Sequence, residues 1–255
     1  MAIQQYYSLS PQTYNDQFWW KKDDIEFWKN LLKKDKSKTL ELAAGTGRLA
    51  IPLIREKINY TGLELSKNYC EYANEQIGLI TKKNKIVQGD MRFFNLDQTF
   101  DNIFIGFNSL LHILNEKDLI KTLGCIKKHM NNKSSLFIDI FVPHTLFLSR
   151  KNNELIKVCE FFDSINKTES SIYEQLKYNH TNEIVDVKWF YKANNRQYEK
   201  FNFKMKMYYP DTMNRILIDS GFKIESLWGD YDKSQFHSES ALQIYQCKLN
   251  KRMNY

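Results

Sequence analysis

The residues best suited to chemistry lie in one stretch, 39–65, where acidic and small residues follow short apolar runs. A short apolar strand leads into a turn of small residues at 43–47, a helix follows, and a second strand ends on Glu64. Glycine permits tight turns and close approach of backbone to a ligand, and a helix N-terminus presents free N–H groups. Glu64 could accept hydrogen bonds from both hydroxyls of a ribose. The stretch therefore predicts a pocket for an adenosine-containing ligand at the carboxyl ends of parallel strands.

Two classes of adenosine cofactor compete for this pocket. Gly45-x-Gly47-x-x-Ala50 satisfies the loose dinucleotide fingerprint, and Glu64 lies about where that fingerprint needs its acid. Glu41, however, stands at the end of the first strand. A carboxylate there suits the cationic amino group of a methionine moiety and disfavours a pyrophosphate. A nicotinamide dehydrogenase is therefore kept only as a remote alternative.

A third apolar run ends near Gln88 and is followed by Gly89, Asp90 and Met91. A carboxylate and a backbone N–H at the tip of this strand could read the edge of an adenine. A dinucleotide fold has no particular need for that pair, so the third run also favours a methionine-containing cofactor.

In combination, these motifs resemble those of the class I S-adenosylmethionine-dependent methyltransferases. The stretch 41–47 resembles their first motif, Glu64 their ribose-binding acid, Asp90-Met91 their adenine pair, and 100–109 their fourth strand and motif. The resemblance covers about residues 38–145 and 210–249, with alanine at 43 where the family usually has glycine. It implies S-adenosylmethionine as cofactor, bound by Glu41, Ala43, Gly45, Gly47, Arg48, Glu64, Leu65, Asp90, Met91, Phe107 and Asn108. For Arg48, pairing with an acid is slightly favoured over binding the cofactor carboxylate.

His112 is the first of two candidate catalytic residues. Methyl transfer from a sulfonium mainly requires positioning of the acceptor, and a base only where the acceptor must lose a proton. The segment 107–114 resembles the matching stretch of sugar N,N-dimethyltransferases from macrolide pathways, in which a histidine faces the acceptor amine. The resemblance thus implies that His112 accepts a proton or orients the acceptor. A helix-start histidine that bonds only to backbone has equal weight.

Tyr14 is the second candidate. In the resembled family the N-terminal segment folds over the cofactor, and a tyrosine there often touches the methionine moiety or the substrate. Tyr6 and Tyr7 also precede the first strand, but Tyr14 fits this role best. An aromatic side chain that merely anchors an N-terminal helix is the equal alternative.

Alternation of apolar strands and amphipathic helices predicts an α/β fold. The expected architecture is a Rossmann-like, seven-stranded, mostly parallel sheet with helices on both faces, plus an antiparallel β-sheet lid inserted after strand five. The last strand is antiparallel in the resembled family. The expected helices are 13–36, 47–57, 66–80, 115–131 and 210–220, with Asn131-Asn132 ending the fourth. The expected core strands are 38–43, 59–64, 84–88, 101–107, 135–142, 222–230 and 241–249.

The inserted sheet is expected from period-two alternation at 155–163, 169–178, 183–192 and 198–209. Phe201, Phe203 and Met205 would face one way, and turns are expected at 180–182 and 194–195. The predicted domains are an N-terminal helical cap (1–37), a Rossmann-like S-adenosylmethionine-binding domain (38–149 and 210–255), and the lid (150–209), which binds substrate or mediates dimerisation.

Composition narrows the class of protein. The chain has 255 residues, 42% of them hydrophobic, and its net charge of +7 comes from lysines spread along the sequence. No apolar run approaches the length of a membrane span, and four widely separated cysteines show no metal-type spacing. We therefore expect a cytoplasmic protein with reduced thiols, no metal and no membrane partner, either a monomer or a homodimer.

The predicted function is transfer of a methyl group from S-adenosylmethionine to a nitrogen or oxygen of a small-molecule acceptor. Asn108-Ser109-Leu110-Leu111 stands where amino-methylating enzymes of DNA bases carry Asn/Asp-Pro-Pro-Tyr/Phe, and no separate RNA-binding module is visible. Nucleic acid is thereby disfavoured as acceptor. Two alternatives stay open: a methyltransferase acting on RNA or protein, and a non-catalytic protein that binds S-adenosylmethionine.

Overall fold

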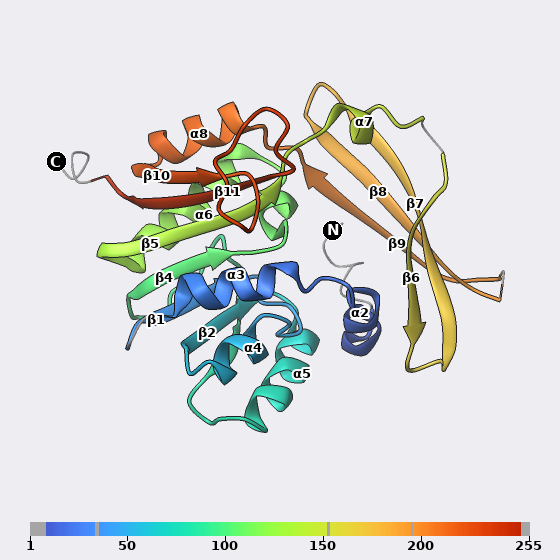
Figure 1. The fold of residues 1–255 in the computed structure, drawn as a ribbon, viewed down its shortest axis with the longest axis horizontal. Coiled ribbons are helices and arrows are strands. Elements are labelled where there is room, and N and C mark those ends of the chain that lie inside the picture. Colours follow the sequence, from blue (N-terminus) through green and yellow to red (C-terminus); the bar gives the residue numbers. More distant parts are fainter. Residues whose placement is uncertain (1–8, 34–35, 152–153, 195, 251–255) are drawn as a thin grey trace. The chain divides into compact units, whose positions relative to one another are not determined.

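The computed structural model describes residues 9–33, 36–151, 154–194 and 196–250 (Figure 1). Contacts between residues divide the chain into two compact units. The sheet unit comprises Asp23–Val142 and Tyr208–Tyr255, and the insert unit comprises Met1–Lys22 and Pro143–Met207. The predicted domain bounds stay predictions. Within the described residues, no helix is long and apolar enough to cross a membrane.

The sheet unit is built on seven strands in the order β10-β11-β5-β4-β1-β2-β3. Neighbours from β5 to β3 run parallel, and β11 is antiparallel to both β10 and β5. The predicted seven-stranded, mostly parallel sheet is confirmed. The order places β1 and β4 side by side at the point where it reverses, and ligands of such sheets bind outside the carboxyl ends there. The strands are β1 Lys38–Leu42, β2 Asn59–Glu64, β3 Lys85–Gln88, β4 Phe100–Ile105, β5 Met130–Phe141, β10 Phe222–Trp228 and β11 Leu242–Leu249.

Helices cover both faces of this sheet, with α3, α4 and α5 on the near face in Figure 1 and α6 and α8 behind it. On the near face, buried Trp28 of α3 packs on Phe104 of β4, with ring centroids 4.6 Å apart. Burial of such large apolar side chains is the main force that holds the layers together. The helices are α3 Asp23–Leu32, α4 Ala50–Arg55, α5 Lys67–Gly78, α6 Glu116–Lys128 and α8 Pro210–Asp219, and a 3₁₀ turn, η1, spans Ser109–His112.

Two predicted helix boundaries are wrong for identifiable reasons. The predicted helix 13–36 is two helices, because the chain leaves helical geometry at Phe18 and begins a new helix at Asp23. Asn131 and Asn132 lie in β5 and do not end a helix. The helix before them stops at Lys128, and the buried ring of His129 then accepts a hydrogen bond from the Leu96 N–H and bonds the Cys125 carbonyl.

The insert unit contains a four-stranded antiparallel sheet in the order β6-β7-β8-β9, as predicted. Its helices are α2 Pro11–Gln17 and α7 Thr145–Leu148, and its strands are β6 Ile156–Asp163, β7 Thr168–Asn179, β8 Ile184–Ala193 and β9 Arg196–Lys206. Phe201 and Phe203 are buried on one side of β9, as the alternation predicts. Asn195 of the second predicted turn lies outside the described residues.

Helix α2 is joined to the inserted sheet by polar contacts that the sequence did not suggest. The Asp16 carboxylate accepts hydrogen bonds from the backbone N–H (2.9 Å) and hydroxyl (2.7 Å) of Ser164. The Trp19 indole N–H donates to the Glu160 carbonyl (3.0 Å), and the Tyr191 hydroxyl donates to Gln17. Helix α2 thus belongs to the insert unit, whereas α3 belongs to the sheet unit.

The turn after β1 replaces the first part of the predicted helix 47–57. Ala43, Gly45 and Gly47 all have positive φ angles, of 59°, 58° and 84°, so α4 begins only at Ala50. A side chain on Gly47 would lie 3.3 Å from the Cβ atom of Ala73, so this position also lacks room. Of the three, only Ala43 carries the steric cost of a left-handed conformation.

Replacing Ala43 with glycine should stabilise the protein. The left-handed conformation costs an alanine about 1–2 kcal/mol, and the greater freedom of glycine in the unfolded chain offsets part of this gain. We expect Ala43→Gly to raise the free energy of unfolding by about 0.5–1 kcal/mol in urea denaturation. The control Ala44→Gly, at a buried neighbour without positive φ, should lower it; equal effects of the two changes would contradict this account.

Candidate functional site

Glu64, at the tip of β2, connects the loops that follow two neighbouring strands. Its side chain is nearly buried, with 2% exposure. One carboxylate oxygen accepts the N–H of Gly45 at 2.9 Å, and the other accepts the N–H of Ser66 at 2.8 Å. An ionised carboxylate donates no hydrogen bond and can accept several, which suits it to ribose hydroxyls. The geometry is compatible with the predicted role of Glu64.

Glu41, on neighbouring β1, is a buried carboxyl group with one strong partner. The Tyr60 hydroxyl on β2 donates a hydrogen bond of 2.5 Å to it. This contact requires a glycine at position 62, because a Cβ atom there would lie 2.9 Å from the Tyr60 hydroxyl oxygen. Sequence reasoning missed Tyr60, although Tyr60-x-Gly62 on the adjacent strand was the available signal.

Burial raises the pKa of Glu41 to about 8, although the Tyr60 hydrogen bond and the charge of Arg48 act in the opposite direction. The negative charges of Asp24 and Glu64 add to the increase. The group is thus largely protonated at neutral pH, and a cation bound beside it would favour its ionised form. This is the behaviour expected of a carboxyl group that ionises when a cationic ligand binds beside it.

Arg48 is held by a buried acid at the start of α3. Its two terminal nitrogens lie 2.8 and 2.7 Å from the two carboxylate oxygens of Asp24, which is fully buried. The guanidinium carbon also lies 5.1 Å from the centre of the Phe107 ring. The pairing alternative for Arg48 is what the structure shows, and binding of a cofactor carboxylate stays a prediction. The acid is Asp24, in the first turn of α3.

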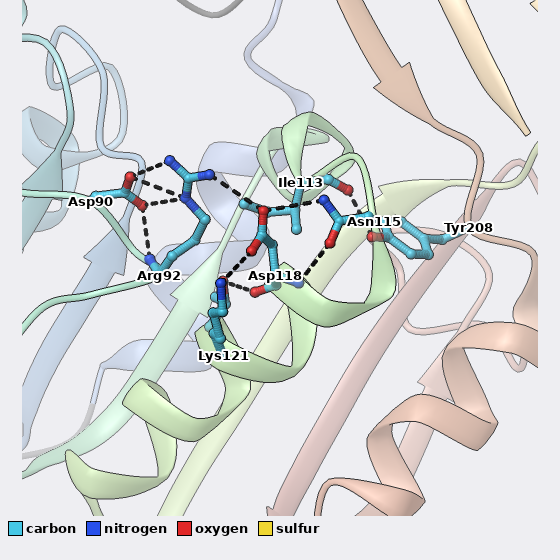
Figure 2. A network of polar contacts seen from close by, with 8 residues as sticks. Asp90, Arg92, Ile113, Asn115, Asp118, Lys121 and Tyr208 are labelled. Atoms are coloured by element: carbon cyan, nitrogen blue, oxygen red, sulfur yellow. Dashed lines mark hydrogen bonds and ion pairs between the residues drawn. The ribbon is translucent and has the colours of Figure 1, made fainter. Parts of the chain in front are cut away.

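The tip of β3 carries Asp90 and Met91, the predicted adenine pair. Asp90 is ion-paired with Arg92, two residues further along the chain (Figure 2). Burial alone would raise the pKa of Asp90, but the hydrogen bonds and charge of Arg92 outweigh it and hold the pKa below its usual value. Leu65, beyond the tip of β2, is partly exposed, and its carbonyl accepts a hydrogen bond from the Gln88 amide. The three strand tips of β1, β2 and β3 thus each carry one of the predicted acids.

The loop after β4 adopts a strained conformation. Phe107 and Asn108 have φ angles of 48° and 65°, which non-glycine residues seldom adopt. Three hydrogen bonds from β5 compensate: the Phe107 N–H donates to the Asp139 carboxylate (3.1 Å), the Asn108 N–H to the Asp139 carbonyl (3.0 Å), and the Phe141 N–H to the Asn108 side chain (2.7 Å). Strain of this kind clusters at functional sites.

Asp139 and Tyr231 are further candidate residues that sequence reasoning missed. Asp139 is buried, and the Tyr231 hydroxyl donates to the same carboxylate oxygen that accepts the Phe107 N–H, at 2.9 Å. Burial, followed by the negative charge of Asp139, raises the pKa of Tyr231, so the hydroxyl keeps its proton and acts as a donor. The signal for Asp139 was a lone acid in the apolar run 136–141.

The two predicted catalytic residues lie in different units. His112 is the last residue of η1, directly after the strained loop, and is partly buried. Tyr14 lies in α2 of the insert unit, where its ring meets that of Phe18 edge-on at 4.9 Å. The catalytic roles of both residues stay predictions. The described residues contain no group of acids, histidines and cysteines that could hold a metal ion.

The pKa of Glu41 should make stability depend on pH. The folded protein binds this proton more tightly than the unfolded chain, so the free energy of unfolding should fall as pH rises from about 5 to about 8. Glu41→Gln keeps an acceptor for Tyr60 but cannot ionise. We expect the variant to gain stability relative to the native protein across this window, by about 1–3 kcal/mol in denaturation at several pH values. If the free energies of unfolding of the variant and of the native protein changed in parallel with pH, the raised pKa of Glu41 would be contradicted. The control is Glu71→Gln, at an exposed acid.

Comparisons with known proteins agree with this geometry. Residues 39–133 match the family profile described as "Methyltransferase domain". A relative from Bacillus subtilis (strain 168), "Putative methyltransferase YqeM", is 21% identical over 227 residues, which cover 88% of this chain and 89% of that protein.

Solved structures share the fold at low sequence identity. An S-adenosylmethionine-dependent methyltransferase from Clostridium acetobutylicum ATCC 824 superposes with a TM-score of 0.75 at 18% identity, over 93% of this chain and 96% of its own. The sugar N-methyltransferase KedS8 from Streptoalloteichus sp ATCC 53650 gives a TM-score of 0.67 at 16% identity, over 88% and 86%. Residues 39–133 thus match a methyltransferase domain, and the fold of the chain is that of solved S-adenosylmethionine-dependent methyltransferases.

Proposed function

We propose that this protein transfers the methyl group of S-adenosylmethionine to a nitrogen or oxygen of a small-molecule acceptor. One observation carries the proposal: Glu41, Glu64 and Asp90 stand at the tips of three adjacent parallel strands, and Glu64 holds the glycine turn between β1 and α4. Three acids in this order suit a ligand that presents, in turn, a cationic amino group, a ribose and an adenine. A pyrophosphate would meet net negative charge here.

Each acid has a distinct role in this arrangement. Glu41 would attract the amino group of the methionine moiety, beside the turn of Ala43, Gly45 and Gly47. Glu64 would bind the ribose hydroxyls through its carboxylate oxygens. Asp90 and the N–H of Met91 would read the adenine, with Leu65 packing beside it. Arg48 would act from its ion pair with Asp24 by fixing the end of this turn.

Phe107, Asn108 and His112 would form the methyl-transfer side of the site. The cofactor supplies an activated methyl group on a sulfonium, and the acceptor lone pair displaces the thioether in line. The strained loop, held by Asp139, fixes Phe107 and Asn108 at the end of β4. His112 would orient the acceptor or take the proton that it loses. Full transfer activity of His112→Ala on the true acceptor would contradict this role.

A small acceptor is supported by the structural likeness to KedS8, a sugar N-methyltransferase. No observation favours RNA, protein or a non-catalytic role in this way. A small polar acceptor would also need few basic contacts, in agreement with lysines that are spread along the sequence. The oligomeric state and the cytoplasmic location stay predictions.

The acceptor class can be tested directly. Methyl-tritiated S-adenosylmethionine is incubated with the protein and a bacterial lysate, which is then separated into small-molecule, RNA and protein fractions. We expect label in the small-molecule fraction. Label that enters only RNA or protein would replace the proposed acceptor class, and tight cofactor binding without any label would support a non-catalytic protein.

Glu64 provides a test of cofactor placement that needs no acceptor. Glu64→Gln removes the charge but keeps one acceptor oxygen, and charge-assisted hydrogen bonds are worth roughly 1.5–3 kcal/mol each. We expect the dissociation constant for S-adenosylhomocysteine, measured by titration calorimetry, to rise by about 10- to 100-fold. The control Glu71→Gln, an exposed acid on α5, should leave it unchanged. Unchanged affinity in the Glu64 variant would refute the ribose role.

A further inference from the structure

Arg92 occupies most of the acceptor positions of Asp90. One oxygen of Asp90 accepts the backbone N–H (2.9 Å) and the Nε–H (3.0 Å) of Arg92, and the other accepts Nη2 (2.5 Å), with Nε at 3.1 Å. The guanidinium therefore approaches side-on and bidentate, and the backbone N–H closes a tight turn on the same carboxylate. Such paired contacts are strong and directional.

Arg92 is itself fixed from the opposite side by the first turns of α6. Its Nη1 lies 3.5 Å from the Asp118 carboxylate, which also pairs with Lys121 at 2.9 Å. Asn115, the N-cap of α6, donates to Asp118 at 3.2 Å. The carbonyl of Arg92 accepts the Cys125 thiol at 3.3 Å. Figure 2 shows this chain of contacts running from Asp90 through Arg92 to Asp118.

The number of acceptor positions on Asp90 decides what it can recognise. An ionised carboxylate offers about four positions and donates no hydrogen bond. Three N–H groups of Arg92 make two contacts to each oxygen, because the Nε–H is shared between both oxygens, so the carboxylate can accept at most about one further hydrogen bond. A ligand group that donates a single hydrogen bond fits this position. A carbonyl oxygen at the same place would meet an unpaired lone pair and be repelled.

We infer that Arg92 is a specificity-determining positioning residue, which restricts Asp90 to a purine with a 6-amino group and rejects one with a 6-oxo group. The inference rests on the proposed function, in which Asp90 reads the adenine. Arg92 acts without touching the ligand. It keeps the carboxylate ionised and fixed in rotation, so that a neutral or rotated carboxyl cannot donate to a 6-oxo group.

The test compares two ligands that differ only in the purine, where the 6-amino group and the acceptor N1 of adenine are replaced by a 6-oxo group and an N1–H; the change of their affinity ratio between variants isolates the part that depends on Asp90. S-adenosylhomocysteine and S-inosylhomocysteine are titrated into the native protein and variants, and the ratio of their dissociation constants is the readout. We expect the native protein to prefer the 6-amino ligand by about 10-fold or more, the value of one charge-assisted hydrogen bond. Arg92→Gln should reduce this preference at least about fivefold, and Asp90→Asn should abolish or reverse it.

Matched variants separate positioning from a general loss of charge or fold. Lys121→Gln removes the same charge from the same network without contacting Asp90, and its selectivity should equal that of the native protein. Arg92→Lys keeps the charge but loses the bidentate contact, so its selectivity should fall between the native and Arg92→Gln values. If thermal unfolding shows that Arg92→Gln does not fold, Arg92→Lys takes its place as the test variant.

Two failures can be told apart. If Arg92→Gln weakens both ligands equally and keeps their ratio, the inference is wrong while the proposed function stands. If the native protein binds neither ligand, or if Asp90→Asn leaves the native preference unchanged, the assignment of the cofactor site itself fails.

Discussion

The physical constraint on this sheet unit is that several carboxyl groups lie close together at the carboxyl edge of the sheet, most of them away from water. Burying a charge is costly unless it is paired or hydrogen-bonded. Each acid meets the constraint in a different way. Glu41 takes a proton and the Tyr60 hydroxyl, Glu64 takes two backbone N–H groups, and Asp90 takes a guanidinium. The acids of this edge are thus each compensated by a group of the protein itself.

Two further acids at this edge support backbone and side chains. Asp24 binds both terminal nitrogens of Arg48, and Asp139 accepts the Phe107 N–H and the Tyr231 hydroxyl. Both are buried, so removal of one partner would leave an uncompensated charge. These contacts fix the turn after β1 and the loop after β4, between which the predicted methyl-transfer chemistry takes place. The positions of this turn and this loop are therefore set by charge compensation as much as by apolar packing.

The features that could be predicted from the sequence are those that depend on residues close together along the chain. Strand tips, the glycine turn and the alternation of the insert lie within short windows, so the fold and the acids at 41, 64 and 90 could be placed. Partners distant in sequence could not be placed. Such hydrogen-bond partners depend on strand register and loop placement. Examples are Tyr60, which bonds Glu41, Asp24, which bonds Arg48, and Tyr231, which bonds Asp139. The membership of α2 in the insert unit was missed for the same reason, because its contacts span more than 140 residues.

The position of β11 has a consequence for the order in which the chain can fold. β11 is the last described strand along the sequence, yet it lies inside the sheet, between β5 and β10. During synthesis, β5 is complete long before residues 242–249 exist, and until then one of its edges has no hydrogen-bonding partner. Unpaired strand edges invite pairing with other chains, and contacts of long sequence separation form slowly. The nascent protein therefore depends on β11, the last described strand, to cover this edge of β5.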